Sequence, residues 1–238
     1  MLNKFNKLKS VKRLLCTVVS LLLLLSATGC DVNKFLSNYL SDEIKQQYLT
    51  ESGQDAYDLV NDNIPFFTEE DMTTDAFEEY SDLDYLGRCQ TAYACIGKEL
   101  MPTEKRGKIG SVKPTGWHSS KYDFVDGKYL FNRCHLIGYQ LTGENANKRN
   151  LITGTRFMNT EGMLPFENDV AEYIKSTNNH VLYRVTPIFE GNDLVARYVI
   201  MEAKSVEDNG EGICFNVVVY NIQPGVHINY ATGDNYAE

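Results

Sequence analysis

The sequence predicts an α+β domain in which an antiparallel sheet is combined with a few helices. Two observations predict it: alternating or mostly apolar runs after residue 180 are separated by glycine-containing turns, and a helical stretch precedes them. The length of 238 residues and the hydrophobic share of 43% suit one folded domain with short appendages. We find no internal repeat.

The first thirty residues have the pattern of an export signal. Basic residues between Lys4 and Arg13 precede the apolar run Leu14–Leu25, and small residues then lead to Cys30. This run is shorter than the ~20 residues that span hydrocarbon, which argues against a permanent transmembrane helix. Residues 27–30 resemble a bacterial lipobox, with Ala27 where Leu is usual. We therefore expect lipidation of Cys30 and anchoring at the outer face of the cell membrane, with ordinary cleavage and secretion as the alternative.

The next segment is acidic, because residues 31–87 contain 15 acidic residues and only two lysines. We expect residues 31–79 to form an acidic tether and N-terminal extension, and residues 80–238 to form the folded domain. Within the extension, the pattern predicts a short strand and a proline-containing turn over residues 55–67, then a short helix or turn over residues 69–80.

The elements of the domain follow in order along the chain. Pro165 suits an early helical position, and apolar residues recur at helical spacing after it. Gly191 and Asn192 form a hairpin signal between two of the later runs. The pattern predicts strand-like fragments at 109–112, 128–131 and 150–153, a helix at 165–176, and strands at 181–186, 195–203 and 214–219.

Positive charge is concentrated in one stretch of an acidic chain. Between Lys98 and Arg156 there are eleven basic and five acidic residues, a net charge of +6, whereas the whole chain carries −9. The acidic balance argues against nucleic-acid binding by the chain as a whole. The local excess instead predicts a polyanion site within this stretch, in preference to scattered surface lysines.

The cysteines allow disulfides in an exported domain but do not indicate a zinc site. There is no CxxC pair, and Cys16 and Cys30 belong to the leader. Our first choice of pairing is Cys89–Cys95 with Cys134–Cys214, and four buried free thiols are the alternative.

Four histidines are candidates for chemistry. We expect His180, in a polar turn, and His227, near the C-terminus, to be exposed, and His118 to be a candidate substrate contact. His135 lies in the strand-like run around residue 133, directly after Cys134. Neighbours in a strand point to opposite faces, which excludes a Cys–His dyad, and no GxSxG elbow is present.

Several motifs recur in the order typical of one family. Asn-Arg-Cys-His at 132–135, Asn-Leu-Ile-Thr at 150–153, Asn159 and Pro-Phe-Glu-Asn-Asp-Val at 165–170 resemble the DNA/RNA non-specific endonuclease family. The likeness is greatest to its DNA-uptake branch in naturally transformable Gram-positive bacteria, and it covers roughly residues 80–233. It implies a ββα-metal nuclease fold, with a central antiparallel sheet flanked by helices.

The resemblance also implies the site residues. The Asp-Arg-Gly-His signature of the family falls on residues 132–135, so that Asn132 replaces Asp and Cys134 replaces Gly, while the histidine is kept. Asn132 removes a negative charge beside the base, and Cys134 affects packing. The implied roles are general base for His135, metal ligand for Asn159, orientation of the metal-bound water for Glu167, and support for Asn150. The guanidinium chemistry of Arg133 and Arg156 separately suits clamping of phosphate oxygens.

These residue types suit phosphodiester hydrolysis. An imidazole accepts a proton near neutral pH, and Mg²⁺ requires few protein oxygens, with Mn²⁺ as a substitute. We expect a monomeric enzyme that cuts DNA, with RNA as a second candidate substrate. The rival hypotheses are a catalytically silent surface lipoprotein that binds DNA or other polyanions, and a toxin-type nuclease with the same chemistry.

Overall fold

The computed structural model describes residues 55–238. The export signal, Cys30 and residues 31–54 of the expected tether lie outside the described residues. Within the described part, no helix is both long enough and apolar enough to cross a membrane.

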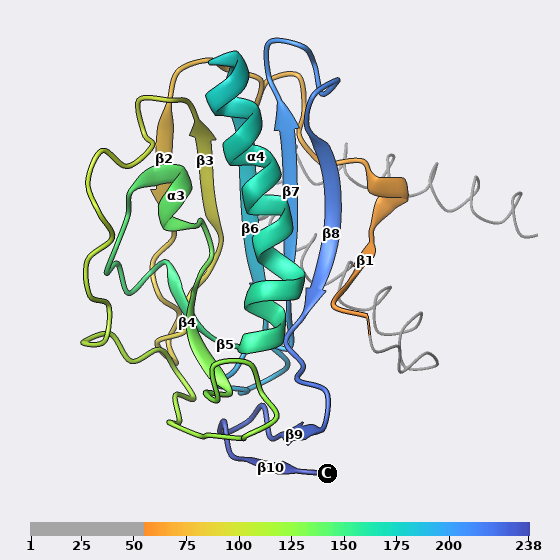
Figure 1. Ribbon diagram of the computed structural model, residues 1–238. Helices are drawn as coiled ribbons and strands as arrows, with labels where there is room; N and C mark the ends of the chain where they lie inside the picture. Colours follow the sequence, from red (N-terminus) through yellow and green to blue (C-terminus); the bar gives the residue numbers. More distant parts are fainter. Residues whose placement is uncertain (1–54) are drawn as a thin grey trace, which may run out of the picture. The chain divides into compact units, whose positions relative to one another are not determined.

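A six-stranded antiparallel sheet forms the centre of the fold (Figure 1). Its strand order is β1-β8-β7-β6-β3-β2, and every neighbouring pair is antiparallel. The α+β prediction is confirmed. The edge strands β1 and β2 both begin before residue 80, where we expected the domain to begin. The strands are β1 (Tyr57–Leu59), β2 (Phe77–Tyr80), β3 (Ala92–Ile96), β6 (Val181–Ile188), β7 (Tyr198–Ser205) and β8 (Cys214–Tyr220).

A strand–strand–helix unit packs beside this sheet. The antiparallel strands β4 (Phe131–His135) and β5 (Leu151–Thr155) form a separate two-stranded sheet. The short helix α3 (Tyr139–Thr142) lies between them in sequence. A π-helical turn, Met158–Met163, leads into helix α4 (Leu164–Thr177), which runs along one face of the large sheet (Figure 1). The remaining elements are the 3₁₀ turn Asn61–Asn63 and the hairpin of β9 (Val226–Ile228) and β10 (Asn235–Ala237).

Helix α4 has the ends and the apolar face that its sequence predicts. Pro165 occupies its first turn, where a missing N–H costs nothing. Val170 and Ile174 are buried in the main core, between the helix and the large sheet. The helix ends at Asn178, which adopts a left-handed φ of 59° and donates its N–H to the carbonyl of Ile174.

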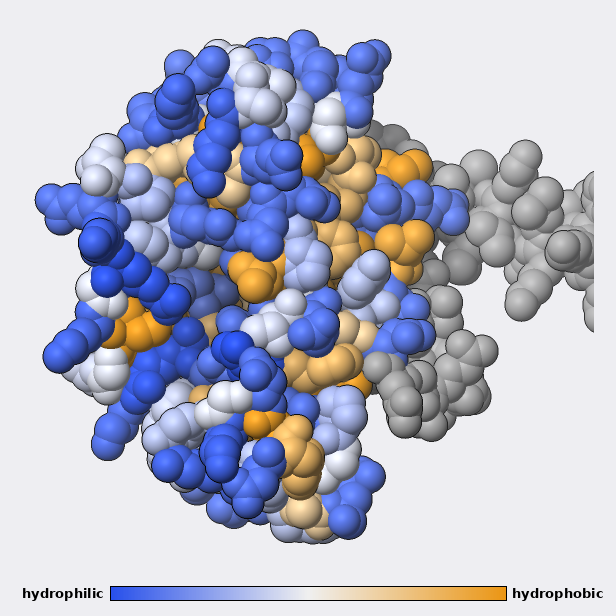
Figure 2. Space-filling model, in the orientation of Figure 1, coloured by the Kyte–Doolittle hydropathy of each residue, from blue (hydrophilic) through white to orange (hydrophobic). Residues whose placement is uncertain are grey.

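A smaller apolar cluster lies apart from the main core. Leu130 and Phe131 pack there with the buried residues of β9, and Trp117 covers them. Exposed hydrophobic side chains are scattered in separate patches on the mostly hydrophilic face shown in Figure 2. The second cluster thus supports the strand that carries the signature residues.

Three local predictions were wrong in whole or in part. Residues 69–71 form a turn as one alternative expected, but residues 77–80 form strand β2, where the Phe77 ring packs edge-on against Tyr93 at 5.0 Å. Residues 109–112 form a loop that contains a turn. Of residues 128–131, only Phe131 joins a strand, whereas Tyr129 makes a single bridge to Lys121.

All four cysteines of the described chain are free thiols, so our first choice of disulfides was wrong. Cys89 donates to the carbonyls of Lys148 and Leu151, and Cys95 donates to that of Thr73. Three of the four are buried as the alternative expected, whereas Cys214 is exposed. Burial raises the pKa of the Cys134 thiol, whose strand neighbour is His135, so Cys134 is a packing residue.

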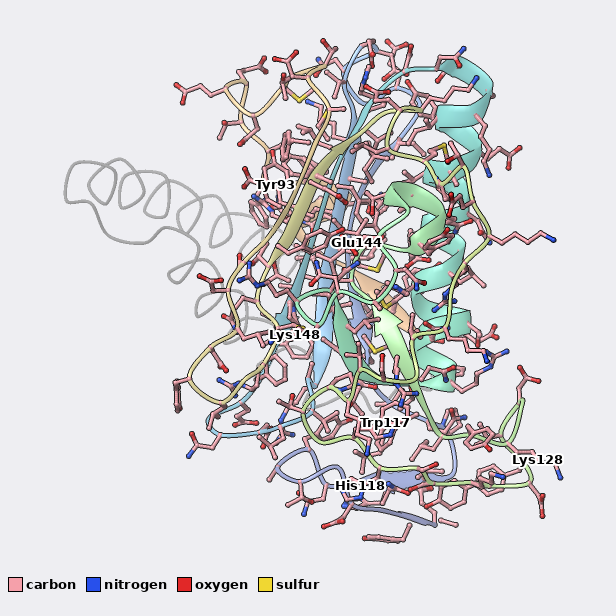
Figure 3. All side chains as sticks on the ribbon, turned by 90° about the vertical axis from the view of Figure 1, so that its left-hand side faces the viewer. Tyr93, Trp117, His118, Lys128, Glu144 and Lys148 are labelled. Carbon is pink, nitrogen blue, oxygen red and sulfur yellow. The ribbon has the colours of Figure 1, made fainter. Side chains whose placement is uncertain are left out.

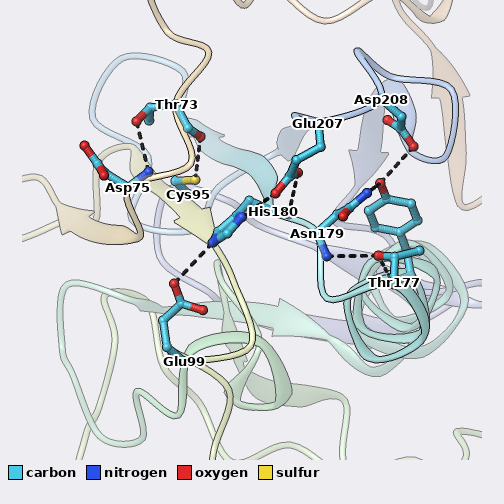
Figure 4. A network of polar contacts seen from close by, with 10 residues as sticks. Thr73, Asp75, Cys95, Glu99, Thr177, Asn179, His180, Glu207 and Asp208 are labelled. Carbon is cyan, nitrogen blue, oxygen red and sulfur yellow. Dashed lines mark hydrogen bonds and ion pairs between the residues drawn. The ribbon is translucent and has the colours of Figure 1, made fainter.

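His180 is not a freely exposed residue, as we had expected, because two carboxylates hold its ring (Figure 4). Its Nδ1 lies 2.6 Å from Glu207 Oε1, and its Nε2 lies 3.2 Å from Glu99 Oε1. Burial opposes the charged imidazole, but the two carboxylates outweigh burial and raise its pKa. His227 is exposed on β9 as expected and packs against the Tyr236 ring at 4.8 Å.

Candidate active site

A cavity of about 300 Å³ opens where the strand–strand–helix unit meets the loop before it. It gathers side chains from β4, α3, the π-helical turn and the start of α4, which are far apart in sequence. The lining residues are Arg106, Asn132, Arg133, His135, Gly138, Tyr139, Gln140, Arg156, Asn159, Leu164 and Glu167. The fold thus places six residues of the predicted site around one space.

His135, the last residue of β4, is buried with 7% of its surface exposed. Its Nε2 lies 2.8 Å from the carbonyl of Asn145, which can only accept, so Nε2 carries the proton and Nδ1 keeps a lone pair. Burial and the positive charge of Arg106 lower the imidazole pKa to about 4, so His135 is neutral at pH 7. The carbonyl of Asn145, and not the residue at 132, fixes the ring.

Asn159 and Glu167 face the cavity from neighbouring turns. Asn159 is the second residue of the π-helical turn, a helix distortion that is frequent at functional sites. Glu167 lies in the first turn of α4, where burial raises its carboxyl pKa to about 7 although the charge of Arg106 opposes the shift. Gly138 makes room for this carboxylate, because a Cβ there would lie 2.6 Å from Glu167 Oε2.

Two of the arginines in the cavity wall have strong partners. Arg133 stacks over the Trp117 ring at 4.0 Å and donates to the carbonyls of Val112 and, at 3.1 Å, Gly110. Arg156 donates through Nε and Nη2 to Asp126 Oδ2, at 3.0 and 2.7 Å. In this conformation, Arg133 therefore also holds the loop that precedes β4.

The structure shows the surroundings of Cys134 and Asn132, the two residues that differ from the family signature. The Cys134 side chain is completely buried, and a Cβ on Gly154 of β5 would lie 2.4 Å from its sulfur. A glycine on the partner strand thus makes room for the cysteine. Asn132 faces the cavity, and its amide nitrogen is buried without a partner in the described structure.

Two residues of the predicted set do not line the cavity. Asn150 is fully buried, and its side chain accepts from the N–H of Ile137 at 2.9 Å and donates to the carbonyl of Ile137 at 3.0 Å. His118 is exposed, and its Nε2 lies 3.1 Å from the carbonyl of Thr232. Figure 3 shows His118 with Trp117 at the end of the molecule that carries β9 and β10.

Arg106 is the main residue that the sequence analysis did not assign to the site. Its Nη2 lies 3.4 Å from His135 Nδ1, although 29 positions separate the two residues. Tyr139, Gln140 and Leu164 also line the cavity without having been predicted. The only signal for Arg106 was its place in the basic stretch, and no local pattern indicates which cation of that stretch reaches the histidine.

The donor set suits a hard divalent cation. The side chains of Asn159 and Glu167 bring oxygen atoms to the cavity wall, and Asn132 and Gln140 add amide oxygens. Magnesium and manganese favour such oxygen donors and keep several of their waters. In residues 55–238 there is no group of three or more His, Cys, Asp or Glu side chains arranged to hold a metal.

Two antiparallel strands followed by a helix, with a neutral histidine, an amide and a carboxylate around one cavity, define the class of a ββα-metal nuclease. A family profile described as DNA/RNA non-specific endonuclease matches residues 68–207, and the chain belongs to this family.

Known proteins resemble the chain in sequence and in fold. A deoxyribonuclease of Streptococcus dysgalactiae subsp. equisimilis is 34% identical over 111 residues, which cover 44% of this chain and 32% of the relative. The match therefore spans about a third of that protein's length. NucA from Streptococcus agalactiae with bound magnesium superposes with a TM-score of 0.68 at 26% identity, over 83% of this chain and 97% of NucA. The Sda1 nuclease with bound zinc gives a TM-score of 0.64 at 24% identity, over 82% and 99%, and supports the fold.

Proposed function

We propose that this protein is an exported, membrane-anchored, metal-dependent endonuclease that hydrolyses phosphodiester bonds of DNA without sequence specificity, with RNA as a second substrate. The observation that carries the proposal is the setting of His135, a neutral imidazole whose Nε2 is fixed by a carbonyl and whose Nδ1 keeps the lone pair that can accept a proton. That imidazole shares its cavity with Asn159, Glu167 and Arg156. Membership of the nuclease family supports the same reaction.

His135 is the general base in this proposal. Its Nδ1 accepts a proton from the attacking water, and the carbonyl of Asn145 stabilises the imidazolium that forms because Nε2–H already points to it. A pKa of about 4 keeps this base unprotonated across the neutral range. The low pKa also makes it a weaker base, so the chemistry depends on further activation within the cavity.

Asn159 and Glu167 are the proposed residues for the divalent ion. Asn159 would hold Mg²⁺ or Mn²⁺ directly, and Glu167 would position water beside it. When bound, such an ion supplies Lewis-acid stabilisation of charge on the phosphate and on the leaving oxygen. The Mg-bound NucA is a relative with this fold, and its magnesium supports the choice of metal.

The basic loop before β4 supports a nucleic-acid substrate. Lys105, Lys108 and Lys113 are exposed, and none of them forms an ion pair within residues 55–238. Cations of this kind attract phosphates by charge alone, and phosphate contacts carry no sequence information. Cutting without sequence specificity follows from such contacts.

The test is digestion of unrelated plasmids by the full chain in detergent, with Mg²⁺, with Mn²⁺ and with EDTA. We expect metal-dependent cutting that leaves 5′-phosphate ends. His135→Ala should lose ~10²–10⁴-fold in rate with little change in DNA affinity. Asn159→Ala should recover part of its activity at higher Mg²⁺, and His135→Ala should not.

DNA binding without cleavage under every metal condition would refute the enzyme and favour the silent polyanion-binding lipoprotein. Export and anchoring are tested separately with Cys30→Ser, which should release the protein from the membrane fraction or leave it unprocessed. A membrane fraction unchanged by this substitution would refute the lipid anchor.

A further inference from the structure

Arg106 reaches the cavity on a segment that is not part of the strand–strand–helix unit. Two contacts fix this segment: the Tyr139 hydroxyl donates to the carbonyl of Glu104 at 2.8 Å, and Gly107 lies close to the Asn145 side chain. A Cβ at position 107 would be 2.8 Å from the Asn145 amide nitrogen. The segment therefore lies against the residue whose carbonyl holds His135.

The position of Arg106 is chemically unusual, because a cation faces the one nitrogen that must accept a proton. Arg106 Nη2 is 3.4 Å from His135 Nδ1, which is long for a hydrogen bond, and the arginine is otherwise exposed. While the guanidinium stays there, it occupies the approach to the Nδ1 lone pair.

Arg106 differs from the other two arginines of the cavity in its partners. Arg156 is held by a carboxylate, and Arg133 is held by two carbonyls and an aromatic ring. Arg106 forms no ion pair within the described part of the chain. Its charge acts on Glu167 across the cavity, but its only direct polar contact among residues 55–238 is the long one to His135. Of the three cavity arginines, it can therefore move to a stronger acceptor most readily.

We infer that Arg106 is a phosphate-binding residue that covers the base in the free protein and uncovers it when a phosphodiester enters. A charge-assisted, bidentate arginine–phosphate contact at about 2.7–2.9 Å is much stronger than a long contact with a neutral imidazole. The incoming phosphate therefore draws the guanidinium away from Nδ1, and the attacking water takes its place. This inference rests on the proposed nuclease function.

The first test measures binding without turnover. A fluorescent DNA duplex is titrated in EDTA with the full chain, with Arg106→Gln and with the matched control Arg149→Gln. Arg149 belongs to the same basic stretch but pairs with Asp82 and does not line the cavity. Arg106→Gln should weaken binding about ten-fold and lower the salt slope by about one. Arg149→Gln should change affinity less than about two-fold, because Arg149 lies outside the cavity and does not contact the phosphate bound there.

The second test observes the base directly. The ¹⁵N signal of His135 Nδ1, assigned by its loss in His135→Gln, is recorded with and without the duplex in EDTA. In the wild type the duplex should shift this signal to the position that free Arg106→Gln already shows. The charged groups that face the ring across the cavity are Arg106, Arg133, Arg156 and Glu167. The signal should also titrate at higher pH in Arg106→Gln, because the cation in contact with the ring is removed.

The outcomes separate this inference from the nuclease proposal. If the wild type cuts DNA while Arg106→Gln binds like Arg149→Gln and leaves the Nδ1 signal unchanged, Arg106 has no such role and the nuclease proposal stands. If Arg106 governs binding but the wild type cuts no DNA, the nuclease proposal fails and only the phosphate contact remains. Should Arg106→Gln fold poorly, Arg106→Lys tests the same point, because it keeps the charge but loses the bidentate contact and should bind with intermediate affinity.

Discussion

Replacing Asn150 tests whether this residue supports the structure of the site or takes part in the chemistry. The resemblance to the family gives this residue a supporting part, and the structure shows what it supports. Its side chain is fully buried and forms two hydrogen bonds to the backbone of Ile137, next to the glycine that makes room for Glu167. Replacing Asn150 by Ala removes both bonds and leaves a buried N–H and a buried carbonyl without partners.

The magnitude follows from those two groups. Each of the two buried backbone groups left unsatisfied costs about 1–3 kcal/mol, so Asn150→Ala should lower the free energy of unfolding by about 2–6 kcal/mol. For a domain of this size, 1 kcal/mol corresponds to about 2–4 °C in Tm, so the melting temperature should fall by roughly 4–24 °C, which is ~12 °C at the middle of both ranges.

The assay is thermal unfolding by circular dichroism, combined with the nuclease rate well below the Tm. Asn147→Ala is the matched control, because it removes one exposed hydrogen bond in the same loop and should change the stability by less than about 0.5 kcal/mol. Folded Asn150→Ala should lose less than the ~10²-fold in rate that marks a residue in the chemistry. An unchanged Tm with a large loss of rate would refute this reasoning and place Asn150 on the metal or the substrate.

Two further predictions concern regions outside the cavity. The raised pKa of His180 contributes stability that is fully present below the ordinary imidazole pKa near ~6.5 and is lost as pH rises through the folded pKa. The lowered pKa values of Glu207 and Glu99 contribute stability that is present above the ordinary carboxyl pKa and is lost as pH falls through the folded values. His180→Gln should therefore lower the Tm by about 2–4 °C near pH 6 and much less at pH 9, and an equal loss at both pH values would contradict the ion pairs. Maleimide labelling of the native protein, followed by peptide mapping, should modify the exposed Cys214 fast and the three buried cysteines only after unfolding. Dithiothreitol should leave the Tm unchanged. A reducible Cys134–Cys214 peptide would overturn the free-thiol assignment.

Much of the fold could be predicted from the sequence, because several elements are specified by local patterns. The helix at 165–176 has an early proline and a buried apolar face, and the strands after residue 180 alternate between glycine turns. In each case the side chains that decide the element lie within the element itself. The strand character of residues 131–135 likewise sufficed to separate Cys134 from His135.

Of the two edge strands, β1 lies within the stretch where the sequence predicted a short strand, whereas β2 could not be predicted. Strand β2 exists because residues 77–80 pair with β3 and Phe77 meets Tyr93, and a local reading of an acidic segment cannot show either contact. The cysteine pairing failed for the same reason, since thiol distances depend on how the strands are placed.

The sequence by itself determined the fold class, the principal elements and the identity of most residues around the cavity, since residue types in a fixed order carry that information. Only the tertiary structure decided what each residue contacts. It assigned the orientation of His135 to the carbonyl of Asn145, buried Asn150 against Ile137, and brought Arg106 to within 3.4 Å of the histidine. These relations join backbone groups and loops across the fold, and a backbone carbonyl has the same chemistry at every position, so no residue pattern can record them.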